Sequence, residues 1–282
     1  MIKYYSVNGT LVPADAATLG VSDLAILRGY GMFDFFLVKN GRPLFLEDYL
    51  DRVEKSAAQL HLHLPVTREE LSGQIMRVIR ANGLPDASMR LVLTGGYAED
   101  GYSPSVPNLL IMEYPFPHYP PSRYTQGVKL MLHEYQRTFP SAKSINYLVG
   151  IYLLPQQKAA GADDVLFHHN GLIYETTRAN FFIVKQDGTI VTAADGILEG
   201  ITRKKLLEVA RRHFRVEERN LSMEELKTAS EAFITSSTKR VMPVVQVGDV
   251  VIGDGKPGEV THRLLDLLKA EEEAYIAALT IR

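Results

Sequence analysis

A proline-rich run near the middle of the chain is the feature that most constrains its fold. Four prolines fall within residues 115–121. Proline has no backbone N–H and a fixed φ, so such a run cannot form a helix interior or a central strand. It is typical of a stiff, extended linker. We therefore expect a linker over residues 116–124, between one domain over residues 1–115 and another over residues 125–282.

Turn and capping patterns mark the elements of the first half. Asn8-Gly9 between two short β-rich runs predicts a hairpin. Apolar residues recur at helical spacing from Glu47 to about Leu60. Thr67 and Glu70 have the spacing of a capping box, which predicts the start of a second helix that ends near Gly83.

The second half contains clusters of strand patterns with helical patterns between the clusters. One helix is expected over residues 146–160, and an amphipathic helix over residues 261–278 is expected to be the last element. Strands in clusters favour α+β layers over a strict βαβ alternation. We therefore expect a two-domain α+β protein.

Composition excludes several classes of function. The 282 residues are 46% hydrophobic and 23% charged, with a net charge of −2, so long-range attraction to nucleic acid or to an anionic membrane is not expected. The chain has no cysteine, which excludes disulfides, zinc thiolate sites and cysteine nucleophiles. No run has the length and apolarity of a membrane span. We expect a soluble, cytoplasmic protein.

Two histidine pairs are weak candidates for a metal site. His61 and His63 stand at a loop end, and His168-His169 precedes a turn. No acidic cluster accompanies either pair to complete a ligand shell. We therefore expect no bound metal.

Several separated blocks carry a resemblance that covers nearly the whole chain. In order and spacing, the sequence resembles the fold-type IV pyridoxal-phosphate (PLP) enzymes, namely branched-chain aminotransferases, D-amino-acid transaminases and aminodeoxychorismate lyases. The matching blocks are Asp48–Arg52, Lys143–Tyr147, Gly161–Leu166, Tyr174–Phe182, Leu198–Arg203 and Phe233–Ser237. The resemblance implies a D-amino-acid aminotransferase-like fold with a small N-terminal α/β domain, a larger C-terminal domain that carries the cofactor lysine, and PLP in the cleft between them.

The resemblance also assigns roles in catalysis. Lys143 would hold PLP as a Schiff base and then act as the base that removes the substrate α-proton. Glu175 would pair with the pyridine nitrogen and keep it protonated, so that the ring accepts electrons. Without the resemblance, either residue could equally be a solvated surface charge.

Further residues would bind the rest of the cofactor. Arg52 can contact the phosphate with two hydrogen bonds. Ile201 and Thr202 open a helix, whose free N–H groups favour an anion. The remaining candidates are Ser236 and Ser237 for the phosphate and Tyr147 for the ring hydroxyl.

Substrate recognition departs from the usual family patterns. Phe33 agrees with branched-chain enzymes, but their following Gly-x-Arg is replaced by Phe35-Phe36-Leu37. The Arg-x-His trap of D-amino-acid enzymes is missing from the loop over residues 95–102. Candidates for binding the substrate α-carboxylate are therefore Arg28, Arg90 and Arg178. For Arg90 the alternative is an internal salt bridge with Asp34 or Glu113.

Three functions are compatible with these residues. We expect a transaminase acting on an amino acid and a 2-oxo acid, with D-amino acids favoured over branched-chain L-amino acids. An aminodeoxychorismate lyase would use the same cofactor residues, and a non-catalytic PLP carrier would need no substrate arginine. The resemblance further implies a homodimer, with residues from both subunits at each site.

Overall fold

The computed structural model describes residues 2–280, with Thr280 described by its backbone alone. Within residues 2–280 there are two compact units. The first comprises residues 2–117, 142–146 and 275–280, and the second comprises His118–Ser141 and Tyr147–Ala274. The first division falls inside the expected linker of residues 116–124. Residues 281–282 of the expected second domain lie outside the described residues.

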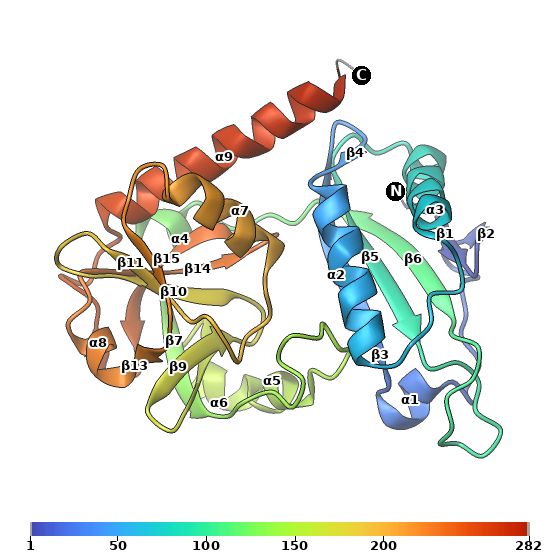
Figure 1. The fold of residues 1–282 in the computed structure, drawn as a ribbon, viewed down its shortest axis with the longest axis horizontal. Helices are drawn as coiled ribbons and strands as arrows, with labels where there is room; N and C mark the ends of the chain where they lie inside the picture. The colour runs from blue at the N-terminus through green and yellow to red at the C-terminus, as the bar shows by residue number, and fades with distance from the viewer. Residues whose placement is uncertain (1, 281–282) are drawn as a thin grey trace. The chain divides into compact units, whose positions relative to one another are not determined.

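The first unit is built on an antiparallel sheet with strand order β2-β1-β6-β5-β3-β4. Its strands are β1 (Tyr4–Val7), β2 (Thr10–Pro13), β3 (Gly31–Lys39), β4 (Arg42–Pro43), β5 (Ala87–Thr94) and β6 (Leu109–Pro115). Its helices are α1 (Leu24–Arg28), α2 (Leu46–Gln59) and α3 (Arg68–Asn82). Both α2 and α3 lie against this sheet (Figure 1).

Local patterns in the first half are confirmed. Asn8 and Gly9 both have positive φ, as a two-residue hairpin turn requires, and they join β1 to β2. Thr67 and Glu70 form the full capping box of α3, and Gly83 ends that helix in the left-handed conformation.

The two faces of this sheet differ in character. Phe36 on β3 is buried and packs against Tyr49 of α2, with ring centroids 5.2 Å apart and the rings tilted. The sheet face that carries Phe36 is therefore covered by α2. Met89 pairs with Phe36 across the strands and lies on the same face. Arg90, the next residue on β5, therefore points to the opposite face.

The second unit is built on a sheet that closes on itself. Its strands are β7 (Val128–Glu134), β8 (Asp164–His169), β9 (Leu172–Thr176), β10 (Asn180–Val184), β11 (Ile190–Thr192), β12 (Val216–Glu218), β13 (Leu221–Ser222), β14 (Glu231–Ser236), β15 (Arg240–Val247) and β16 (Val250–Val251). The order is β12-β11-β10-β14-β15-β7-β8-β9-β13, and β9 also pairs with β10. Strands β10, β14, β15, β7, β8 and β9 thus form a closed ring.

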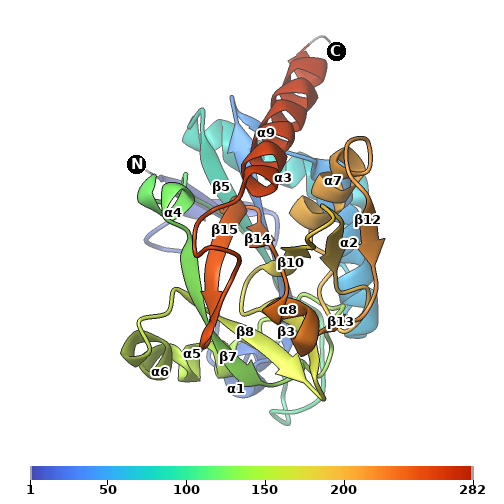
Figure 2. The ribbon, with the colours of Figure 1, turned by 90° about the vertical axis from the view of Figure 1, so that its left-hand side faces the viewer.

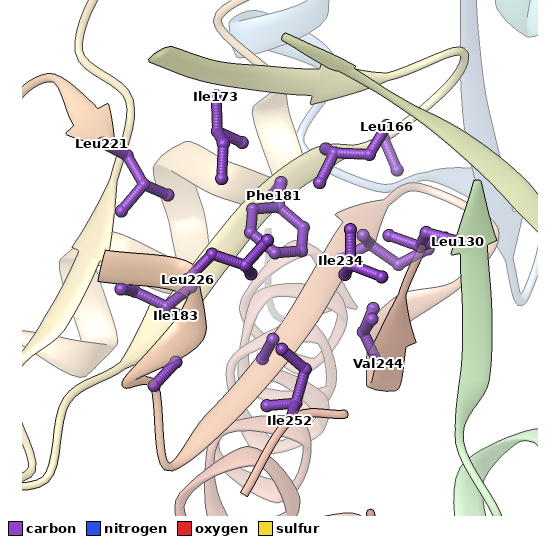
Figure 3. Close-up of a cluster of buried hydrophobic side chains, with 14 of the residues drawn as sticks. Leu130, Leu166, Ile173, Phe181, Ile183, Leu221, Leu226, Ile234, Val244 and Ile252 are labelled. Atoms are coloured by element: carbon purple, nitrogen blue, oxygen red, sulfur yellow. The ribbon is translucent and has the colours of Figure 1, made fainter. Parts of the chain in front are cut away.

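Each of these ring strands contributes to one apolar core (Figure 3). The contributing side chains include Leu130, Leu166, Ile173, Phe181, Ile234 and Val244. A second core lies where α7 (Ile201–Ala210) and α9 (Glu259–Thr280) pack on β10 and β14 (Figures 1 and 2). The remaining helices are α4 (Ser122–Thr125), α5 (Leu148–Tyr152), α6 (Leu154–Ala159) and α8 (Met223–Lys227).

The helix expected over residues 146–160 is two short helices instead. Helix α5 ends before Leu153, and α6 begins at Leu154 with Pro155 in its first turn. Proline lacks the N–H that would continue the α5 ladder, and it is tolerated at the start of a helix. The single-helix prediction was therefore wrong because the effect of Pro155 was overlooked.

No helix within residues 2–280 is long and apolar enough to cross a lipid bilayer.

Glu113 on β6 is a buried acid within the first unit. It is fully buried, and within residues 2–280 neither carboxylate oxygen has a hydrogen-bond partner. Burial raises its pKa from 4.5 to about 7, although the nearby Asn82 amide opposes the shift. That amide donates its own hydrogen bonds to the carbonyls of Tyr4 and Val78. Glu113 therefore takes up a proton on folding at mildly acidic pH.

This proton uptake predicts a pH-dependent stability. Because the folded-state pKa is raised, proton binding by Glu113 contributes to the free energy of unfolding. This contribution is fully present below pH 4.5 and is lost as the pH rises through about 7. A Glu113→Gln variant stays neutral at every pH. Its melting temperature relative to that of the wild type should therefore rise between pH 5 and pH 8. The corresponding rise in its relative free energy of unfolding should be about 3 kcal/mol at most. Replacing the exposed Glu99 by Gln serves as control, and a gain that does not change with pH would contradict this account.

Candidate active site

The segment that carries Lys143 is held by the first unit. The backbone N–H of Phe33 donates to the Lys143 carbonyl (2.9 Å), and the N–H of Ile145 donates to the Gly31 carbonyl (3.1 Å). Ser144 forms an antiparallel bridge with Met32. The segment thus pairs with the start of β3, on the edge opposite β5.

Gly31 permits this close pairing. A Cβ atom at Gly31 would stand 2.7 Å from the Leu93 carbonyl oxygen and 3.1 Å from a methyl of Ile145. No larger residue fits there without a shift of β3. The sequence prediction placed the lysine in the second domain, whereas these hydrogen bonds group residues 142–146 with the first unit.

The Phe33 ring lies beside two cationic side chains. The Lys143 ammonium is 4.6 Å from the ring centroid, and the Arg90 guanidinium is 5.9 Å from it. Arg90 also lies 5.3 Å from the Tyr114 ring. Lys143, Phe33 and Arg90 are thus brought together, on the face of the sheet away from α2.

Arg90 has no acidic partner among residues 2–280, so the salt-bridge alternative is wrong for both acids. Asp34 binds Arg52 instead. Glu113 pairs with Met89 across the strands and shares its face, which is opposite to that of Arg90.

Arg52 is oriented by Asp34. Its Nε and Nη2 atoms donate to the two carboxylate oxygens of Asp34 at 2.9 and 2.6 Å, and both side chains are buried. The guanidinium also stacks near the ring of Tyr49, 5.1 Å from its centroid. A planar cation is therefore fixed on α2.

Glu175 in the second unit is held through both carboxylate oxygens. Arg137 donates to one oxygen at 2.8 Å, and the backbone N–H of Leu198 donates to the other at 3.1 Å. Arg137 also donates to the Pro140 carbonyl. Both charged side chains are largely buried, so the carboxylate has a fixed orientation. Sequence reasoning missed Arg137, because a lone arginine in a loop has no local pattern.

The start of α7 offers donors for an anion. Gly200 is the N-cap residue, and it has no side chain that could make a capping hydrogen bond. A Cβ atom at position 200 would stand 2.2 Å from the Asn180 amide oxygen, so a larger residue there would force the Asn180 side chain to move. The N–H groups of Ile201 and Thr202 belong to the first turn, which has no intrahelical acceptors for them.

The other expected residues of the second unit lie at turns. Ser236 ends β14, and its hydroxyl accepts the backbone N–H of Lys239 at 3.2 Å. Ser237 follows in the same turn. Tyr147 is half-buried at the N-terminus of α5.

The other two expected substrate arginines lie on other elements of the chain. Arg28 ends α1, where its guanidinium donates to the Leu27 carbonyl at 2.9 Å. Arg178 is exposed in the turn between β9 and β10.

The side chains present fit PLP chemically. A cofactor of this kind needs an amine for its aldehyde, a carboxylate for its ring nitrogen and donors for its phosphate. The first unit offers Lys143 and a fixed Arg52. The second unit offers Glu175 with a fixed carboxylate and the glycine-capped start of α7.

Comparisons with known proteins agree with this donor set. The family model for amino-transferase class IV matches residues 31–247. A Methanocaldococcus jannaschii protein, provisionally named a branched-chain-amino-acid aminotransferase, is 31% identical over 95% of this chain and 96% of its own. A D-alanine aminotransferase of Bacillus licheniformis is 29% identical over 93% and 94%.

Solved structures give the same result. The branched-chain amino acid aminotransferase from Escherichia coli superimposes with a TM-score of 0.85 at 26% identity, over 94% of this chain and 92% of that one. Another branched-chain amino acid aminotransferase, solved with pyridoxamine 5'-phosphate, superimposes with a TM-score of 0.90 at 25% identity, over 98% and 95%. The expected fold-type IV, α+β architecture is confirmed. This chain belongs to the class IV aminotransferases, and it is an enzyme of the family that uses pyridoxal phosphate to move amino groups.

Proposed function

We propose that Lys143 and Glu175 are the catalytic residues of this aminotransferase. When bound, PLP supplies an aldehyde that captures the substrate amino group and a ring that withdraws electrons from the α-carbon. The Lys143 amine takes the proton from the substrate α-carbon and later returns a proton. The Glu175 carboxylate accepts a hydrogen bond from the protonated ring nitrogen.

The phosphate ligands complete the cofactor assignment. We propose that Arg52, the N–H groups of Ile201 and Thr202, and the hydroxyls of Ser236 and Ser237 bind the phosphate, and that Tyr147 binds the ring hydroxyl. Asp34 supports this role by fixing the plane of the Arg52 guanidinium. The charge of Arg52 and the positive end of the α7 dipole both favour an anion.

We propose a D-amino acid and a 2-oxo acid as substrates, with Arg90 binding the α-carboxylate. The observation that carries this proposal is the Phe33 ring, which has both Lys143 and Arg90 within 6 Å of its centroid. A carboxylate on the same α-carbon as the reacting amine needs a cation at such short range. The missing Gly-x-Arg of branched-chain enzymes favours the D-amino acid, and the relatives include enzymes named for either substrate.

The alternatives receive less support. A lyase acting on aminodeoxychorismate would use the same cofactor residues, but the relatives described above are named as aminotransferases. A non-catalytic PLP carrier would have no use for a cationic side chain such as Arg90 beside the lysine.

Exposed apolar side chains support a homodimer. Leu148, Ile151, Tyr152 and Leu154 on α5 and α6 have exposed fractions between 51% and 72%. Apolar patches of this kind mark interaction surfaces. We propose a second copy of this chain as the partner, and Arg28 and Arg178 stay further candidates for binding the substrate carboxylate. The cytoplasm stays our predicted compartment because a cysteine-free chain suits reducing conditions.

Replacing Arg90 tests the substrate proposal. Arg90→Ala loses a charge-assisted hydrogen bond to the substrate, worth about 1.5–3 kcal/mol. The value of kcat/KM for amino acids should fall roughly tenfold to a hundredfold. Activity toward a primary amine without a carboxylate should fall much less. Both enantiomers of each amino acid are assayed, and the D form should react faster.

A matched control is Arg77→Ala, which removes an exposed arginine of α3 whose guanidinium donates to the Gly9 carbonyl. Its kinetics should stay at wild-type values. Equal losses for amine and amino acid in Arg90→Ala, with a lowered melting temperature, would instead identify Arg90 as a structural residue.

Light scattering tests the homodimer. The particle mass should be about twice the 31.5 kDa of one chain. Ile151→Asp should shift the mass toward that of one chain, because a charge buried in an apolar interface is unfavourable. A wild-type particle of single-chain mass would refute the homodimer.

A further inference from the structure

Ser56 on α2 contacts the lysine segment directly. Its side chain is completely buried, and its hydroxyl oxygen accepts the backbone N–H of Lys143 at 3.2 Å. The two residues are 87 positions apart in the sequence, so this is a tertiary contact. The Lys143 carbonyl in turn accepts the backbone N–H of Phe33. Lys143 is therefore held at both its backbone N–H and its backbone C=O.

Ser56 stands one helical turn after Arg52. Residues four apart lie on the same face of a helix, separated by a rise of about 6 Å. Both side chains are buried, and both face the start of β3, where Arg52 binds Asp34. One face of α2 therefore holds the guanidinium of Arg52 and the backbone of Lys143.

This arrangement matches the chemistry of the cofactor. The aldehyde and the phosphate arm of PLP are attached to adjacent carbons of one ring. A lysine that reacts with the aldehyde must therefore be held at a fixed, short separation from the cation that binds the phosphate. Errors in such positioning slow a reaction strongly.

We propose that Ser56 is a positioning residue, whose hydroxyl holds Lys143 in register with Arg52 for capture of the cofactor aldehyde. The inference rests on the proposed roles of Lys143 and Arg52. In the capture step the Lys143 amine adds to the aldehyde carbon, a C=N bond forms, and the aldehyde oxygen leaves as water. Ser56 takes no part in these bonds and acts only through the backbone of Lys143.

A purely structural serine would behave differently. If Ser56 contributed only packing or stability, its loss would lower the affinity for every ligand of the protein alike. Loss of positioning would impair only the step that needs the lysine. Pyridoxamine 5'-phosphate separates these cases, because it has the same ring and phosphate arm as PLP but no aldehyde.

The experiment compares both cofactors on apo-protein. Ser56→Ala should slow the appearance of the lysine-linked PLP absorbance about tenfold or more. Its affinity for pyridoxamine 5'-phosphate should stay within about twofold of wild type. Ser56→Thr, which keeps the hydroxyl, should recover most of the capture rate. Arg52→Ala should weaken binding of both cofactors.

Ser88→Ala is the matched control, since Ser88 is a buried serine of β5 whose hydroxyl bonds the Pro115 carbonyl. It should leave the capture rate unchanged. The proposal is overturned if Ser56→Ala captures PLP at the wild-type rate, or if the substitution weakens the binding of both cofactors by the same factor. Failure of the underlying assignment would look different, because Lys143→Ala would then still develop the absorbance.

Discussion

The pairing of residues 143–145 with the start of β3 is the interaction on which the candidate site depends. It brings a lysine from between two elements of the second unit into the first unit. The same strand carries Phe33 beside the lysine amine and Asp34 bound to Arg52. Because Gly31 has no side chain, the segment can approach β3 closely enough to form these hydrogen bonds.

Fixed orientation is common to the functional groups of both units. Asp34 orients Arg52, and Arg137 with the Leu198 N–H orients Glu175. Removing one partner of a buried ion pair leaves an uncompensated charge, so such pairs hold their geometry well. Preorganised charges of this kind are more effective in catalysis than groups that must first be ordered.

Local patterns in the sequence were sufficient for some elements, and the separated matching blocks were sufficient for the family. The Asn8-Gly9 hairpin and the Thr67–Glu70 capping box depend on neighbouring residues, which a sequence shows directly. The contacts of Lys143 with Ser56 and of Glu175 with Arg137 join distant segments, and no periodicity encodes them. The surroundings of Arg90 needed the strand register, which decides which face each residue occupies.

The most direct test of this account is to locate the cofactor on the chain. Borohydride reduction of the PLP-loaded protein fixes the cofactor to its amine, and peptide mapping then identifies the modified residue. The account predicts the pyridoxyl group on Lys143, in the peptide that pairs with β3. Modification of a different lysine, or of none, would contradict it.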